Sequence, residues 1–118
     1  MLEDYNGAFL DYNKSIQQGN NEFDIYYNRG VAEYYLNDFL KAISDFDRMI
    51  RQDKNYVDAY LFRGYSKARI NDQFGAINDF TLALSIDTNN ASGFGNRGLS
   101  YLMTGKYKEA LADLAPRA

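Results

Sequence analysis

Arginine and aspartate are the residues whose spacing in this sequence could support a chemical role. Three Arg–Gly pairs and four aspartates recur at one constant interval: the arginines are Arg29, Arg63 and Arg97, and the aspartates are Asp11, Asp45, Asp79 and Asp113. Guanidinium groups bind carboxylates through paired hydrogen bonds. The pattern therefore predicts either a structural ladder, in which each Asp meets the Arg of the next repeat, or a row of cations for an acidic ligand. We favour the ladder, because each Arg has a periodic Asp that can neutralise it.

Other chemistry has little support in the composition. The 118 residues include no Cys and no His, which excludes disulfides, thiolate nucleophiles, Cys/His zinc sites and the usual general base near neutral pH. The sequence also contains no glycine-rich phosphate loop, nucleophile elbow or cluster of metal ligands. We therefore expect no catalytic residue, no cofactor and no metal.

The charge and hydropathy patterns limit the kinds of partner that the protein could bind. With 13 basic and 16 acidic residues the net charge is −3, which argues against nucleic acid because such binders carry a basic surface. No stretch approaches the about 18 apolar residues of a membrane span, and the first residues lack the charge and apolar run of a signal peptide. We expect a cytoplasmic protein whose partner is another protein or a peptide.

The positioning elements follow from the repeat itself. Segments 26–30, 60–64 and 94–98 align without gaps, and each ends in Arg–Gly. Twelve residues after each Gly stands an Ala, and four residues after that Ala stands a large apolar residue: these are Ala42, Ala76 and Ala110, then Phe46, Phe80 and Leu114. Agreement of several residue types over three periods indicates a repeat protein.

Each period contains two segments with helical spacing of apolar residues. The predicted helices span about 3–17, 26–36, 39–50, 58–70, 73–86, 92–104 and 107–115, with breaks at Asn37-Asp38 and Asn71-Asp72 and a C-cap at Gly105. A Gly costs a helix about 1 kcal/mol relative to Ala. The in-phase Gly30, Gly64 and Gly98 therefore predict close helix contacts, with the in-phase Ala as the expected neighbour.

These residues resemble the tetratricopeptide repeat, in which an aromatic residue precedes a Gly by four positions and a small residue precedes an aromatic one in the second helix. The matching positions are Tyr26, Gly30, Ala42 and Phe46, then Tyr60, Gly64, Ala76, Phe80 and Ala83, then Phe94, Gly98, Tyr101, Ala110 and Leu114. The loop Pro of the family is replaced by Asn20, Lys54 and Thr88.

The resemblance implies an all-α fold: an α-solenoid of antiparallel helix pairs, about seven helices in a right-handed superhelix. Residues 1–118 would form one array, with a half repeat at 1–22, repeats at 23–56 and 57–90, and a truncated repeat at 91–118. The first helices of such arrays line a concave groove that holds a peptide or helix of a partner.

The groove positions of the family, carried onto this sequence, are mainly aromatic and apolar. The predicted peptide-binding residues are Tyr27, Asn28, Val31, Tyr34, Leu61, Phe62, Tyr65, Arg69, Asn96 and Leu99. The basic carboxylate clamp of some relatives is absent, because Tyr27, Val31, Phe62, Ser92 and Asn96 occupy its positions. We therefore expect contacts to apolar or aromatic side chains, with Asn28 and Asn96 bonding the partner's backbone.

Three functional hypotheses remain open at this stage. The leading one is a non-enzymatic interaction scaffold with a peptide-binding groove. The second is a self-assembling unit, since the array opens on an unpaired second helix and ends without a polar capping helix, so the ends could bury each other in a homo-oligomer. The third is a regulatory fragment of a longer multidomain protein, and we prefer a fragment to an oligomer as the explanation of the ends.

Overall fold

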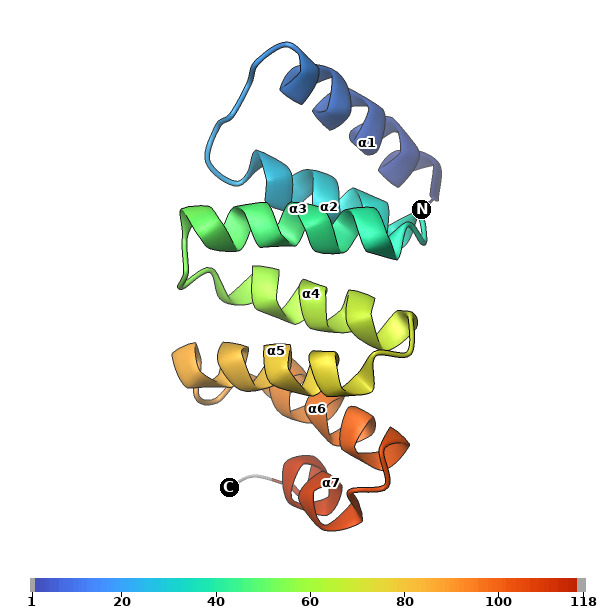
Figure 1. Cartoon of the computed structure of the whole chain (residues 1–118), viewed down its shortest axis with the longest axis vertical. Helices are drawn as coiled ribbons and strands as arrows, with labels where there is room; N and C mark the ends of the chain where they lie inside the picture. The colour runs from blue at the N-terminus through green and yellow to red at the C-terminus, as the bar shows by residue number, and fades with distance from the viewer. Residues whose placement is uncertain (1, 117–118) are drawn as a thin grey trace.

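The computed structural model describes residues 2–116, and this part of the chain contains helices and no strand. The helices are α1 (Leu2–Gln17), α2 (Ile25–Tyr35), α3 (Phe39–Gln52), α4 (Val57–Arg69), α5 (Gln73–Ile86), α6 (Ala91–Met103) and α7 (Tyr107–Leu114). They follow one another along the long axis of an elongated molecule (Figure 1), which measures 49 × 25 × 23 Å. The predicted helices are confirmed, with bounds that shift only slightly at their ends.

The break between the two helices of each repeat is one recurring turn. A left-handed residue ends each first helix, at Asn37 (φ 65°), Asn71 (φ 65°) and Gly105 (φ 78°). The backbone N–H of the next residue reaches back over the turn, as in the 2.9 Å bond from Lys106 to the Tyr101 carbonyl. Asn and Gly tolerate this conformation better than other residues. The turn therefore explains why the pattern breaks at the same phase three times.

The in-phase glycines do mark close contacts, and the nearest group at Gly30 and Gly64 is the ring four residues after the predicted Ala. A Cβ added to Gly30 would lie 2.7 Å from the ring of Phe46, and one added to Gly64 would lie 2.5 Å from the ring of Phe80. The atoms nearest to the glycine thus belong to the residue one turn after the predicted Ala. Helical side chains lean toward the N-terminus, so each ring covers the turn that begins at the Ala.

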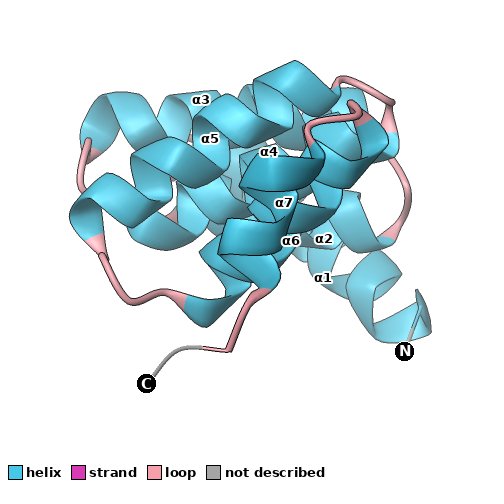
Figure 2. Ribbon diagram, turned by 90° about the horizontal axis from the view of Figure 1, so that it is seen from below, coloured by secondary structure: helices cyan, strands magenta, loops and turns pink. Residues whose placement is uncertain are grey.

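The helices alternate between an inner and an outer row. First helices contact one another, α2 with α4 and α4 with α6, whereas within residues 2–116 no comparable contact joins α1 to α3 or α3 to α5. The array therefore curves with its first helices on the inner side. Figure 2 shows the stack from its C-terminal end, with both rows of helices in view. The fold is an α-solenoid of antiparallel helix pairs.

Candidate functional site

The periodic arginines and aspartates form ion pairs inside each repeat. Arg29 donates from Nε and Nη2 to the two carboxylate oxygens of Asp45, at 2.7 and 2.8 Å. The same two-bond arrangement joins Arg63 to Asp79 and Arg97 to Asp113. The expectation that each Asp would meet the Arg of the next repeat is therefore wrong.

The contact between repeats comes from the remaining guanidinium nitrogen. Nη1 of each Arg donates to the second helix of the preceding repeat: the acceptors are Asn13 at 3.2 Å, Asp47 at 2.8 Å and Thr81 at 3.2 Å. These acceptors are themselves one repeat period apart in the sequence. One Arg thus holds three helices, since its five N–H donors can serve two partners at once. The arrangement fixes the register between neighbouring repeats.

The first aspartate of the series lies outside this ladder. Asp11 is exposed and belongs to none of the described ion pairs. Each described pair joins an Arg to the Asp that stands 16 positions later. The three paired arginine side chains are only 16–19% exposed, so their hydrogen bonds are directed into the protein.

Aromatic rings form a continuous cluster on the inner side of α2 and α4. Phe62 is its centre: its ring centroid lies 6.0 Å from Tyr27, 5.5 Å from Tyr34 and 5.1 Å from Tyr65, all with the rings nearly perpendicular. Edge-to-face contacts of this kind hold rings in defined positions. The cluster is therefore a preformed surface rather than a set of mobile side chains.

Two hollows flank this ring cluster. One of about 190 Å³ contains five predicted groove residues, Tyr34, Tyr65, Arg69, Asn96 and Leu99. The other, of about 180 Å³, contains three more, Tyr27, Asn28 and Val31. Phe62 contacts rings from both hollows. The structure therefore brings nine of the ten predicted residues together on one side of the first helices.

Leu61 is the exception and corrects the prediction. It is 5% exposed and belongs to the hydrophobic core with Tyr60, Ala76 and Phe80. Tyr27 occupies the same position one repeat earlier and is half-buried. A Tyr is long enough to cover the core with its ring and still reach water, whereas a Leu at this position ends beneath the surface.

The polar groups of the groove are few and mostly neutral. Burial raises the pKa of Tyr27, and the nearby Asp58 carboxylate adds to this rise. Burial likewise raises the pKa of Tyr65. Both phenols therefore keep their protons at neutral pH and can donate hydrogen bonds. The guanidinium of Arg69 lies 4.8 Å from the centroid of the Phe39 ring, which places one cation at the edge of an apolar surface.

The two predicted amide contacts are already engaged within their helices. The side-chain nitrogen of Asn96 donates to the Ser92 carbonyl at 2.9 Å, and that of Asn28 lies 3.5 Å from an oxygen of Asp24. An amide has two donor hydrogens and two acceptor lone pairs. One such bond therefore leaves each amide with further capacity for a partner's backbone.

Sequence reasoning missed the contribution of the second helices. Tyr5 and Tyr12 of α1 line one hollow, and Gln73 and Phe80 of α5 line the other. Tyr5 also stacks on Tyr35, with ring centroids 4.4 Å apart. The repeat period could have identified these residues, because Tyr5 stands two periods before Gln73 and Tyr12 stands two periods before Phe80. The resemblance assigns the groove to first-helix positions alone, so it leaves these residues out.

The described residues contain no helix long and apolar enough to cross a membrane. They also contain no group of three or more His, Cys, Asp or Glu side chains placed to hold a metal ion.

Helix pairs that repeat at a constant interval, with first helices on the inner side, define a tetratricopeptide-repeat fold, and several solved structures are similar to this chain. A crystal structure of MamA has a TM-score of 0.87 at 24% identity over 92% of this chain and 64% of that one. YrrB, described as a TPR protein with an unusual peptide-binding site, has a TM-score of 0.88 at 23% identity over 95% and 58% of the two chains.

A third similar structure is MamA 41-end from Desulfovibrio magneticus RS-1, with a TM-score of 0.89 at 17% identity over 95% of this chain and 63% of that one. This chain therefore spans about three-fifths of the length of the structures it resembles. No protein-family model matches the sequence, and the curated proteins give no match. The likeness establishes the fold.

Proposed function

We propose that this chain is a non-enzymatic interaction scaffold that binds a peptide segment of a partner protein in the groove of its first helices. The observation that carries the proposal is the ring cluster around Phe62 with a hollow on each side. Preformed concave surfaces of this kind bind ligands at a low ordering cost. The similar YrrB, described as having a peptide-binding site, adds support.

The chemistry of the groove favours a peptide with apolar or aromatic anchor residues. Three Tyr or Phe rings line each hollow, and aromatic residues are common among the residues that dominate binding energy at interfaces. Arg69 is the one cation that the predicted groove contributes. The peptide is therefore expected to place an apolar side chain in the hollow beside Leu99 and a carboxylate or backbone carbonyl near Arg69.

A random peptide library displayed on phage tests the proposal without a known partner. Leu99 is 54% exposed beside the larger hollow, and Leu111 is 72% exposed on α7 outside both hollows. We expect selected peptides to carry aromatic or branched aliphatic residues, and to bind Leu99→Glu at least about tenfold more weakly, equal to about 1.4 kcal/mol. Leu111→Glu is the matched control and should bind as the parent does.

Two results would contradict the proposal. One is the absence of any enriched peptide that binds the isolated chain. The other is equal loss of binding in Leu99→Glu and Leu111→Glu, which would show that the groove does not determine binding. Circular dichroism of both variants checks that helicity is retained, as expected for substitutions at exposed positions.

A further inference from the structure

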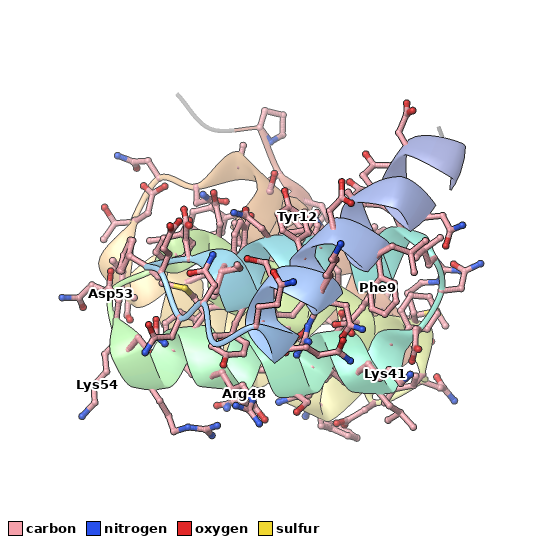
Figure 3. The ribbon with its side chains drawn as sticks, turned by 90° about the horizontal axis from the view of Figure 1, so that it is seen from above. Phe9, Tyr12, Lys41, Arg48, Asp53 and Lys54 are labelled. Carbon is pink, nitrogen blue, oxygen red and sulfur yellow. The ribbon has the colours of Figure 1, made fainter. Side chains whose placement is uncertain are left out.

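A third cavity lies on the opposite side of α2 from the ring-lined groove. It measures about 260 Å³, is open to solvent on one side and is lined by residues of α1, α2 and α3. One liquid water takes up about 30 Å³, so the cavity has room for a small organic group. In the view onto α1, Phe9 lies on the side where Lys41 and Arg48 of α3 are found, while Tyr12 lies on the other side (Figure 3).

Glu33 supplies this cavity with a buried carboxyl group that is hydrogen-bonded to a second carboxyl, that of Asp45. It is 4% exposed, and its Oε1 makes no hydrogen bond. Asp45 lines the same cavity, so two carboxyl groups share it. Burial raises the pKa of Glu33, and Asp45 adds to the rise. Buried polar atoms are rarely left without a partner, and Glu33 is among the residues that line the cavity.

The cations around the cavity are already occupied. Both carboxylate oxygens of Asp45 accept hydrogen bonds from Arg29. Lys41 lies 3.6 Å from Asp38, and the guanidinium of Arg48 lies 5.1 Å from the centroid of the Tyr26 ring. Asn13, from α1, is uncharged and accepts from Arg29. No neighbouring cation is therefore committed to the Glu33 carboxyl.

The next repeat has an ammonium group at the position where the first repeat has the Glu33 carboxyl. Lys67 stands one full period after Glu33, and Asp79 stands one full period after Asp45. The Lys67 ammonium lies 3.1 Å from Asp79 Oδ2, while Arg63 holds the same carboxylate from the other side. An ammonium and a guanidinium thus share one buried carboxylate in that repeat. In the first repeat a carboxyl group replaces the ammonium, and a cavity lies beside it.

We propose that this cavity binds a primary alkylammonium group, the chemistry of a lysine side chain or a small amine. Its nitrogen would replace the proton that Glu33 shares with Asp45 and would donate hydrogen bonds to both carboxylates, as the Lys67 ammonium contacts Asp79 one repeat later. A divalent metal suits the site less well, because its only acidic ligands would be these two carboxylates and Arg29 already engages both oxygens of Asp45.

Proton release gives the proposal a distinct signature. Glu33 holds its proton while no cation is bound, because burial raises its pKa. A bound ammonium favours the carboxylate, so binding should release a proton, and affinity should rise by up to about tenfold per pH unit while Glu33 is protonated. The site is independent of the proposed groove function, since it lies on another face and uses none of the groove residues.

Titration of the whole chain with n-butylammonium, followed by amide chemical shifts, tests the site. Saturable shifts are expected around Phe9, Glu33 and Ser44, which line the cavity. Tetramethylammonium is the matched ligand control, because it has the same charge but no N–H donor, and should leave these shifts unchanged. Comparing Nα-acetyl-lysine amide with butylammonium then separates a partner's lysine from a free amine by their relative affinities.

Two substitutions complete the experiment. Glu33→Lys supplies a built-in ammonium as Lys67 does in the next repeat, and should abolish butylammonium binding. Glu109→Lys makes the same residue change at an exposed position on α7 and should bind as the parent does. Equal shifts with tetramethylammonium, the absence of saturation, or unchanged binding in Glu33→Lys would each overturn the proposal. The comparison of the two ligands needs no variant, so it stands even if Glu33→Lys fails to fold.

Discussion

Gly64→Ala is expected to destabilise the array although Ala is the better helix former. The added Cβ would lie 2.5 Å from Cε1 of Phe80 and 2.9 Å from two further ring atoms. Phe80 is 1% exposed and packed in the core, so its ring has little room to move away. Either the ring must leave its preferred rotamer or α4 and α5 must separate.

The magnitude follows from two opposing effects. Replacing Gly with Ala in a helix contributes about 1 kcal/mol of stability where nothing else changes. Overpacking a well-packed core costs about 1–3 kcal/mol. Gly95 lies in helix α6, and no atom lies within 4 Å of a Cβ added there. Gly95→Ala therefore measures the first effect alone, and Gly64→Ala should be less stable than Gly95→Ala by about 1–3 kcal/mol.

Urea unfolding followed by far-ultraviolet circular dichroism measures this difference. Gly95→Ala should unfold at a higher urea concentration than the parent, and Gly64→Ala at a lower concentration than Gly95→Ala. If Gly64→Ala proved as stable as Gly95→Ala, the close contact between helix and ring would be refuted.

Other predictions concern charge and assembly. Arg29→Ala should cost about 3–5 kcal/mol by leaving Asp45 buried without its cation, and more than Arg63→Ala, where Lys67 still contacts the paired carboxylate; equal losses in urea would contradict this. Because burial raises the pKa of Glu33, the unfolded chain loses that proton first, and stability falls as pH rises above about 4. Glu33→Gln should therefore unfold at higher urea than the parent near about pH 7 and equally near about pH 3, and a constant difference would refute the assignment. If the rival hypothesis of end-to-end assembly holds, light scattering will show mass rising with concentration, and a constant mass would remove it.

The sequence predicted the helices because the evidence for each one is local. Apolar spacing fixes where each helix runs, and Asn37, Asn71 and Gly105 supply the left-handed residue that ends it. The glycine phase likewise predicted that something lies close to each first helix. Which group lies there depends on the direction of side chains in the facing helix, and that is a property of packing rather than of spacing.

The ion pairs show a limit of periodic reasoning. Asp45 lies between Arg29 and Arg63 in the sequence, at nearly equal distances from the two, so a repeat pattern cannot tell which Arg it meets. The packing of α2 against α3 determines that Asp45 pairs with Arg29. The sequence did not predict the additional contact of each Arg to the preceding repeat, such as that of Arg29 to Asn13. The residues at this position of the three repeats are Asn, Asp and Thr, which have no common charge that would reveal a pattern.

The sequence predicted which residues face the candidate groove but not how deeply each of them is buried. Phase alone placed Tyr34, Tyr65 and Leu99 on the inner side, where they line one hollow. It could not separate Leu61 from Tyr27, since both have the same phase and differ only in side-chain length. The cavity at Glu33 could not be predicted from the sequence either, because a single Glu in a helix gives no sign of burial until its neighbours in space are known.

The account depends most directly on the groove of the first helices being the binding surface. Amide chemical shifts of the whole chain, recorded with and without a peptide selected from the library, test this claim. The account predicts that the largest changes fall around Tyr34, Tyr65 and Leu99, on the inner faces of α2, α4 and α6. Changes concentrated on the outer faces of α3 and α5, with these residues unaffected, would contradict it.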